Sequence, residues 1–363
     1  MSEATKKTIV LNGKFLMAPP TGVHRVAEEL IYALDNILTE DPVLRSTYDV
    51  SVFAPRKLHH RLDLKTISFH QGGLFSWIPW EQFDLPRFKP KATRISLCNL
   101  GPAVSRNAIT MFHDAQVYIS PASYSKPFRL WYKFIQPLIG KRHQRILTVS
   151  EYSKSKLVEF GVAPESKISV IHNGVDHILR VAANPDAPAK FGLSERKYVL
   201  SLANAQAHKN IKVLLSAFSD PALADLKLVL FGAASQADLE AASGAPLPSN
   251  VVLAGKISDA DLRGLIEHAL CLAFPSTTEG FGLPPLEAML LGCPAIVADE
   301  GALPEVCGSA TIYASAHAPK QWVEQIRVLA DDPVTWDQWR SKALVQARNF
   351  TWDRAAAKLL EFI

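Results

Sequence analysis

The sequence has little of what marks a disulfide-rich or metal-binding protein. Its 363 residues include four cysteines, none of them at a Cys-x-x-Cys or Cys/His metal spacing. The histidine pairs 59–60 and 172/177 lack a third ligand at metal spacing, so no metal site is predicted. We expect four buried free thiols, at Cys98, Cys271, Cys293 and Cys307.

Long apolar runs are also absent. No stretch approaches the ~18 residues that a membrane-spanning helix needs, and the polar N-terminus, MSEATKK, lacks the apolar core of a secretory signal. No Gly-x-Gly-x-x-Gly follows the first apolar run, and no Gly-x4-Gly-Lys-Ser/Thr occurs. These absences argue against nicotinamide or flavin oxidoreductases and P-loop NTPases. They favour a cytoplasmic protein without a cofactor.

Charge is distributed unevenly along an otherwise ordinary globular composition. Residues 1–173 hold 23 Lys and Arg against 14 Asp and Glu, whereas the remainder holds 16 against 21. The excess is concentrated in residues 51–150, with 15 basic and 4 acidic side chains. Such a field attracts polyanions, acidic ligands or anionic lipid head groups without choosing among them.

Short apolar runs alternate with amphipathic stretches throughout, which predicts α/β units around parallel sheets. Long helices fit residues 22–38, 125–143 and 151–160. Strands are predicted in the first half at 8–12, 48–54, 65–69, 94–98, 108–113, 145–149 and 167–171. Strands are predicted in the second half at 198–203, 226–231, 250–255, 270–274, 294–298 and 311–313.

This pattern predicts two doubly wound α/β domains in tandem. We expect domains at 1–173 and 174–350, a C-terminal helix within 351–363 that crosses back to the first domain, and a linker in the polar segment 172–197. Ligands of open α/β sheets bind at the carboxyl ends of the strands. Functional residues are therefore expected in the loops that follow the strands.

One such loop carries two carboxylates, Glu279 and Glu287, in the segment EGFGLPPLE. Gly280 and Gly282 allow a tight turn and close approach of a ligand. A helix beginning near Leu283 would point its free N–H groups at an anion such as a diphosphate. The two carboxylates would then accept hydrogen bonds from hydroxyls on either side of it. The alternative, a capping Glu and a solvated Glu, is less favoured here.

The segment EGFGLPPLE resembles the E-x7-E element of the retaining GT-B glycosyltransferases of family 4. Further similarities follow in the family's order along nearly the whole chain: PPTGVHRVAEEL, WEQFDLPRF, MFHDAQ, TVSEYSKSKL, VIHNGVD, HKNIKVLLSAF, GALPEVCGSA and FTWDRAAAKLLEF. The resemblance implies two Rossmann-like domains facing across a cleft. It also implies that Glu279 contacts the donor sugar, that Glu287 binds the ribose, and that Gly280, Phe281, Gly282 and Leu283 line the donor site.

Two segments of the first half match family positions that contact the donor. Gly22 and Arg25 open the helix after the first strand, where the family's glycine loop closes over the donor phosphates; a helix capped by Thr21 is an almost equal alternative. His113 ends a predicted strand at the position of a sugar-contacting histidine, and Asp114 is expected to orient its imidazole at most.

Lys209 matches the family's lysine and precedes a helix predicted to start near Asn210. A fixed cation there would stabilise the charge that develops on a leaving diphosphate. Many relatives carry an arginine where this chain has Ala203, and His208 either compensates in part or lies at the surface. Asp259 and Asp261 have a metal-binding spacing, but Ser258 and Asp261 fit a capping box.

The resemblance therefore implies a metal-independent, retaining hexosyltransferase that uses a nucleoside diphosphate sugar. The segments TGV-x-R and WEQ-x-x-LP resemble bacterial surface-polysaccharide mannosyl- and rhamnosyltransferases, which favours GDP-mannose as donor and a glycan or lipid-linked glycan as acceptor. The alternatives are a nucleotide-sugar epimerase of the same fold and, less favoured, a nucleic-acid-binding protein. A helix rich in basic and aromatic residues is expected within 124–145, and it favours reversible contact with anionic lipid. We therefore expect a peripheral location on the inner face of the cytoplasmic membrane.

Overall fold

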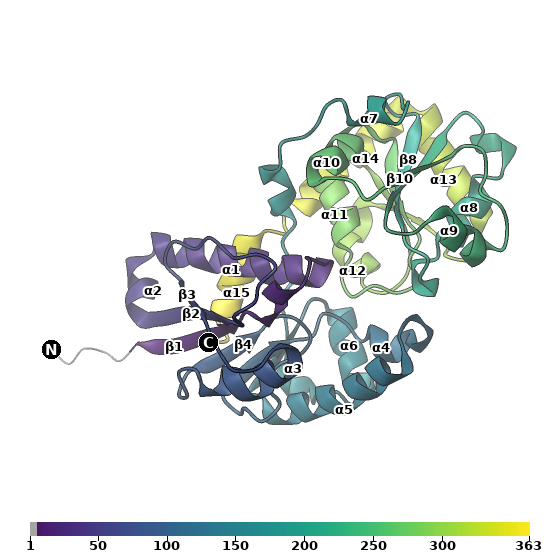
Figure 1. Ribbon diagram of the computed structural model, residues 1–363. Helices are drawn as coiled ribbons and strands as arrows, with labels where there is room; N and C mark the ends of the chain where they lie inside the picture. Colours follow the sequence, from purple (N-terminus) through teal and green to yellow (C-terminus); the bar gives the residue numbers. More distant parts are fainter. Residues whose placement is uncertain (1–5) are drawn as a thin grey trace. The chain divides into compact units, whose positions relative to one another are not determined.

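A computed structural model describes residues 6–363, which form two compact units, each built around a parallel sheet (Figure 1). Unit 1 holds the described residues up to Ile119 together with Tyr124–Gly174 and Thr351–Ile363. Unit 2 holds Ser120–Ser123 and Val175–Phe350. Most of the N-terminal stretch MSEATKK lies outside the described residues.

The sheet of unit 1 has seven parallel strands in the order β3-β2-β1-β4-β5-β6-β7. Its central strands are buried on both faces, because helices cover both sides of the sheet. The strands are β1 (Lys7–Asn12), β2 (Tyr48–Ala54), β3 (Ser68–Gln71), β4 (Thr93–Ser96), β5 (Ala108–Met111), β6 (Arg145–Thr148) and β7 (Ile168–Val170).

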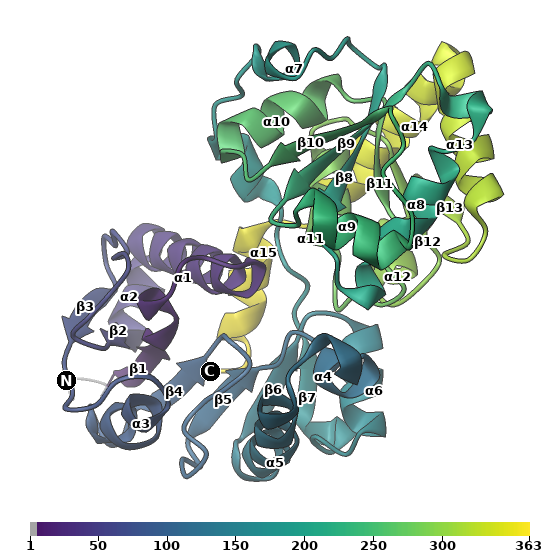
Figure 2. The same cartoon turned by 45° about the vertical axis from the view of Figure 1, so that its right-hand side comes forward.

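Two layers of helices cover this sheet. Figures 1 and 2 show α1 and α15 on one face and α3 and α5 on the other. Helix α15 packs against α1 although some 300 residues separate them in the chain. The helices are α1 (Gly22–Glu40), α2 (Pro42–Thr47), α3 (Trp77–Pro79), α4 (Gln116–Ile119), α5 (Lys126–Arg142), α6 (Glu151–Glu159) and α15 (Trp352–Leu360).

Unit 2 repeats this architecture with six parallel strands in the order β10-β9-β8-β11-β12-β13. The strands are β8 (Tyr198–Ala203), β9 (Lys227–Gly232), β10 (Val251–Gly255), β11 (Cys271–Phe274), β12 (Ala295–Ala298) and β13 (Ile312–Ala314). The helices are α7 (Ala187–Lys190), α8 (Ile211–Ala217), α9 (Gln236–Ser243), α10 (Asp259–His268), α11 (Leu283–Leu290), α12 (Leu303–Cys307), α13 (Pro319–Asp331) and α14 (Pro333–Ala347).

The predicted fold class is confirmed, since every strand range expected from the sequence overlaps an observed strand. The boundary between the units lies between Gly174 and Val175, inside the polar segment 172–197, although the chain from Val175 onward packs as part of unit 2. Arg263 Nη1 donates to the carbonyls of Ile178 and Leu179, and the Asn184 N–H donates to Ala260 O at 3.0 Å.

All four cysteines are free, and three of them are buried as expected. The expectation is wrong for Cys98, which is only partly buried in the loop that follows β4. Burial raises the pKa of the Cys293 and Cys307 thiols to about 12. In residues 6–363, no helix combines the length and the apolar character needed to cross a bilayer.

The core of unit 1 contains a buried imidazole, His143, at the end of α5. Its Nδ1 lies 2.9 Å from Thr110 Oγ1, and its Nε2 lies 3.2 Å from the carbonyl oxygen of Pro102. A carbonyl only accepts, so Nε2 carries the proton. Burial lowers the pKa of His143 to about 4. The ring is therefore neutral at pH 7.

His143 should make stability depend on pH below neutrality. Between the unfolded pKa of about 6.5 and the folded pKa of about 4, the unfolded chain binds more protons at this site, so stability is lost as pH falls. The loss should approach roughly 3 kcal/mol at pH 4. We expect the difference in unfolding free energy between wild type and His143→Gln, measured by urea denaturation, to shrink by that amount from pH 7 to 4. Parallel pH profiles would contradict the assignment.

Candidate functional site

Three neighbouring strands of unit 2, β8, β11 and β12, end at the same edge of the sheet because they run parallel. The loops that follow them are residues 204–210, 275–282 and 299–302. Most of the residues expected to bind a donor lie in these loops or directly after them.

Lys209 and Glu279 are brought together at this edge. Lys209 Nζ lies 2.7 Å from Glu279 Oε1, and the side chains are 18% and 12% exposed. The ammonium also lies 5.6 Å from the centre of the Phe274 ring. Sequence reasoning assigned the two residues to separate contacts and did not foresee that they form a partly buried ion pair.

The position of Lys209 is set by the turn that contains it. Lys209 ends a short 3-10 turn, Ala207–Lys209, and Asn210 then adopts a left-handed conformation with φ of 51°. The Asn210 side-chain amide donates to the carbonyls of Pro275 and Ala316, at 3.2 and 2.8 Å. Helix α8 begins one residue later than expected, at Ile211. The amide thus ties the lysine turn to the loop that holds Glu279.

The backbone of Glu279 is held by the loop after β12. The Ala302 N–H donates to Glu279 O at 3.1 Å. Gly301 has φ of +66°, and a Cβ on it would lie 2.6 Å from the Glu279 nitrogen. Only glycine fits this close approach. Sequence reasoning missed Gly301, although a glycine following a strand end was a signal that could have drawn attention to it.

Glu287 lies on α11, which starts at Leu283 as expected, after Gly282 with φ of 106°. Its Oε1 lies 3.2 Å from Nε2 of His177, whose side chain is 3% exposed. His177 comes from the segment expected to be a linker and was considered only as a metal ligand. The structure instead makes it the partner of Glu287.

His208 is buried, which excludes the alternative that it lies at the surface. Its Nδ1 lies 3.1 Å from Ser123 Oγ, and its carbonyl accepts the N–H of Thr277 at 2.8 Å. Burial, with a smaller contribution from Lys209, lowers the pKa of His208 below its usual range, against the opposing effect of Glu279. The ring is neutral at pH 7 and acts as a hydrogen-bonding group, not as a second cation.

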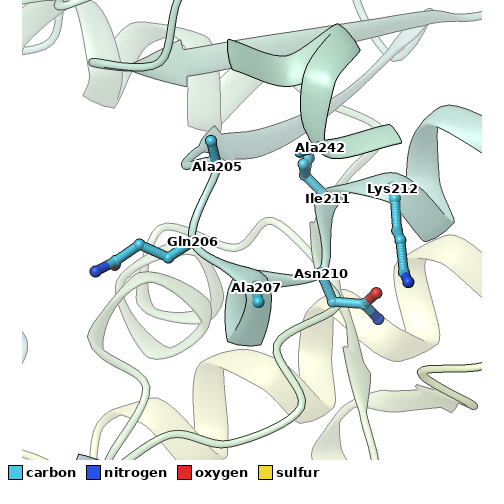
Figure 3. Close-up of a pocket in the computed structure, with 7 residues that line it drawn as sticks. All are labelled: Ala205, Gln206, Ala207, Asn210, Ile211, Lys212 and Ala242. Atoms are coloured by element: carbon cyan, nitrogen blue, oxygen red, sulfur yellow. The ribbon is translucent and has the colours of Figure 1, made fainter. Parts of the chain in front are cut away.

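A pocket of about 160 Å³ lies next to this turn, between the loop after β8 and helix α9. Ala205–Ala207, Asn210–Lys212 and Ala242 line it. Figure 3 shows the Gln206 side chain extending away from Ala242, so that short side chains form much of the wall. The ion pair does not line this pocket.

Comparison with models of protein families assigns the chain to a family. The family model of glycosyl transferases group 1 matches residues 184–346, and that of glycosyltransferase family 4 matches residues 45–178. The two matches cover most of both units. The chain belongs to glycosyltransferase family 4.

Relatives and solved structures agree with this membership. O-antigen chain mannosyltransferase B of Escherichia coli is 28% identical over 267 residues, covering 70% of this chain and 69% of the relative. WaaG, a glycosyltransferase involved in lipopolysaccharide biosynthesis, superposes with a TM-score of 0.71 at 15% identity over 98% and 99% of the two chains. HepE of Anabaena, solved with UDP and glucose, gives 0.70 at 18% identity over 98% and 100%. These two likenesses show the GT-B fold.

In unit 1 of this glycosyltransferase, His113 is buried after β5. Its Nε2 lies 2.7 Å from the carbonyl oxygen of Leu97, and its backbone N–H donates to Asn99 Oδ1 at 2.7 Å. Burial lowers the pKa of His113 to about 4. The neutral ring therefore donates from Nε2 and keeps Nδ1 as an acceptor. The Leu97 carbonyl orients the imidazole, while Asp114 Oδ1 accepts the Gln116 N–H.

Gly22 and Arg25 lie in the first turn of α1, which begins at Gly22. Thr21 is the N-cap, with Oγ1 accepting the His24 N–H at 3.4 Å, as the capping alternative expected. A Cβ on Gly22 would meet no atom within 4 Å. Packing therefore does not require glycine here, and the space beside it is open.

The metal-like spacing of Asp259 and Asp261 is used for helix capping. Ser258 Oγ accepts the Asp261 N–H at 3.1 Å at the start of α10. Hydrogen bonds from Lys190, Asn184 and Ser258 lower the pKa of Asp261 to about 2. Within residues 6–363, no group of three or more His, Cys, Asp or Glu side chains is placed to hold a metal ion.

The bracing of Glu279 can be tested with two glycine substitutions. Gly301→Ala and Gly192→Ala each place alanine at a positive φ, 66° and 61°, which costs about 1–2 kcal/mol of stability. A Cβ on Gly192 meets no atom within 4 Å. We expect both variants to unfold at lower temperature, and only Gly301→Ala to lose donor binding as well, measured by calorimetry. Equal donor affinity in the two variants would show that the bracing is unimportant.

Proposed function

We propose that this glycosyltransferase moves a hexose, with mannose favoured, from a nucleoside diphosphate sugar to a hydroxyl of a glycan or lipid-linked glycan, and retains the anomeric configuration. The observation that carries the proposal is the Lys209–Glu279 ion pair at the carboxyl edge of the unit 2 sheet. The mannosyltransferase relative supports the choice of sugar.

The ion pair is able to bind both parts of the donor, its diphosphate and its sugar. An ammonium has three N–H donors, so Lys209 can keep its bond to Glu279 and still donate to a diphosphate oxygen. The carboxylate of Glu279 retains further lone pairs, which can accept hydrogen bonds from sugar hydroxyls. Lys209 then offsets the charge that develops on the leaving diphosphate, while Glu279 orients the sugar.

Glu287 is proposed to hold the ribose. Its Oε1 is engaged by His177, which orients the carboxylate. Its second oxygen, Oε2, can accept hydrogen bonds from the ribose hydroxyls. The backbone of Gly280–Leu283, at the start of α11, is proposed to donate N–H groups to the diphosphate, because a helix N-terminus attracts anions.

Unit 1 is proposed to supply the remaining donor contacts. The neutral His113 ring can accept a sugar hydroxyl at Nδ1, since Nε2 is engaged by Leu97. Gly22 and Arg25 lie at the N-terminus of the 19-residue helix α1, where the open space beside Gly22 would admit a phosphate or an acceptor group.

In the proposed reaction the bond between the sugar C1 and the diphosphate oxygen breaks, and a bond from the acceptor oxygen to C1 forms on the same face. The acceptor proton passes to the departing phosphate oxygen, so no protein base is required. The proposed mechanism uses no metal, because Lys209 and backbone N–H groups stabilise the leaving diphosphate.

Contact with an anionic membrane is part of the proposal. Leu130 and Phe134 on α5 are 71% and 66% exposed, and Lys126 and Lys133 are exposed on the same helix. Each basic residue near an anionic surface contributes about 1 kcal/mol of attraction. We therefore place the enzyme reversibly at the inner face of the cytoplasmic membrane, where a lipid-linked acceptor would be available.

A donor panel tests the proposed reaction. We expect a GDP sugar, in a panel with UDP, dTDP and ADP sugars, to raise the melting temperature most, since a ligand at 100 times its Kd adds about 2.7 kcal/mol. With a glycan acceptor, free nucleotide and an unchanged anomeric configuration should be seen by NMR. A new sugar nucleotide without release of nucleotide would instead identify an epimerase.

Substitution of Lys209 should lower turnover, whereas substitution of Glu287 should weaken nucleotide binding. Lys209→Ala should lower turnover at saturating donor about a hundredfold or more, whereas Lys212→Ala, three residues further along, should not. Glu287→Ala should weaken nucleotide and nucleotide-sugar binding together by roughly 1.5–3 kcal/mol. His177→Ala removes the group that orients the Glu287 carboxylate and should weaken binding less than Glu287→Ala does. Nucleotide binding by Glu287→Ala that is as tight as in wild type would show that the carboxylate does not hold the ribose.

A further inference from the structure

The loop between β3 and the turn Trp80–Asp84 exposes an unusual run of apolar side chains. All six residues of Leu74–Pro79 are exposed. Leu74 is 87% exposed and Trp77 55% exposed, and Phe75 packs against the exposed ring of Phe83, with 5.9 Å between ring centres. Exposed apolar patches of this kind mark interaction sites. The donor contacts described above do not use this loop.

The loop is held firmly in this exposed arrangement. Trp80 is fully buried, and its Nε1 donates to the Gly72 carbonyl at 2.7 Å. Gly73 has φ of +105°, and a Cβ on it would lie 2.5 Å from the Trp80 ring. The apolar side chains therefore stay outside the core because the residues on either side of them are fixed.

Three backbone groups of the loop have hydrogen-bond partners within the protein. Asp84 Oδ2 accepts the N–H groups of Leu74 and Phe75, at 2.9 and 2.8 Å. The Trp80 N–H donates to Ser76 O at 3.4 Å and closes the next turn. Unsatisfied backbone groups are what oppose entry into a lipid phase. Asp84 removes that cost for two of them.

Few acidic residues occur in the part of the chain that carries this loop. The segment 51–150 contains four acidic residues, of which Asp63 is exposed. Glu81 is buried against Lys14, Asp84 binds the loop amides, and Asp114 Oδ1 accepts a backbone N–H. Exposed basic side chains remain on the same unit: Arg56, Lys57, Arg87, Lys126, Lys133 and Lys141.

Helix α3, which contains Trp77, lies on the same face of the unit 1 sheet as α5 (Figures 1 and 2). The exposed Leu130 and Phe134 of α5 therefore belong to the same layer of the unit as the loop. Tryptophan and phenylalanine side chains with basic neighbours are typical of protein segments that enter the lipid–water interface.

We propose that the loop Leu74–Pro79 inserts into the interfacial region of an anionic bilayer, with Trp77 and Phe75 as the inserted side chains. The inference rests on the proposed membrane contact of α5 and adds an apolar attachment to its electrostatic one. The two attachments differ in their response to salt. Salt screens the attraction of lysines to lipid head groups and does not weaken the burial of apolar side chains.

Partition of the full chain onto vesicles tests the proposal. The vesicles contain phosphatidylglycerol and phosphatidylcholine, and partition is measured by co-sedimentation at low salt and at about 1 M salt. Wild type should retain measurable partition at high salt. Phe75→Ser/Trp77→Ser should lower that residual partition about tenfold or more. Lys126→Gln/Lys133→Gln should instead lower partition chiefly at low salt.

Two controls distinguish insertion of this loop from a general apolar effect and from self-association. Val334→Ser/Val345→Ser removes two similarly exposed apolar side chains from unit 2 and should leave partition unchanged. Equal high-salt partition of wild type and Phe75→Ser/Trp77→Ser would overturn the proposal. So would a change from dimer to monomer in that variant, by analytical ultracentrifugation without lipid, because the loop would then contact a second copy of the chain. Donor binding, measured in parallel, reports separately on the proposed transferase site.

Discussion

Parallel pairing of every strand is the constraint on which the remaining structure depends. It brings the carboxyl ends of all strands in a sheet to one edge, so the loops that follow them are collected there. In unit 2 this edge holds Lys209 and the loop of Glu279. In unit 1 it holds His113 and the loop after β3 that carries Trp77. The candidate functional residues of each unit therefore lie at one end of its sheet.

A close backbone contact and a side-chain amide fix the geometry of the unit 2 loops. The loop after β12 braces Glu279 at Gly301, and the turn of Lys209 is tied to the next loop by the Asn210 amide. Both Gly301 and Asn210 adopt positive φ. Such positions hold a carboxylate and an ammonium at a set separation before any ligand arrives, which is the preorganisation that electrostatic stabilisation requires.

Burial keeps several imidazoles of the chain neutral. The pKa values of His113, His143 and His208 are all lowered, with burial as the largest cause. These rings consequently serve as hydrogen-bonding groups at neutral pH. Positive charge near a bound anion must then come from lysine, arginine or backbone N–H groups. This division is relevant because the resemblance to family 4 predicts an arginine where this chain has Ala203.

Local sequence determined the strands, because buried parallel strands are short apolar runs whatever surrounds them. The glycine and proline pattern predicted the start of α11 at Leu283, and motif similarity selected Lys209, Glu279 and Glu287 as candidate site residues. The tertiary structure alone decided which side chains meet. His177 reaches Glu287 from 110 residues away, and Gly301 fits against Glu279 only after two loops have folded together. It also decided that the apolar residues at 74–78 stay outside the core, since the neighbouring Trp80 and Asp84 occupy the interior positions. Hydrophobic periodicity indicates which side chains of one segment can be buried. A contact between distant segments forms only when the folded chain has brought those segments together.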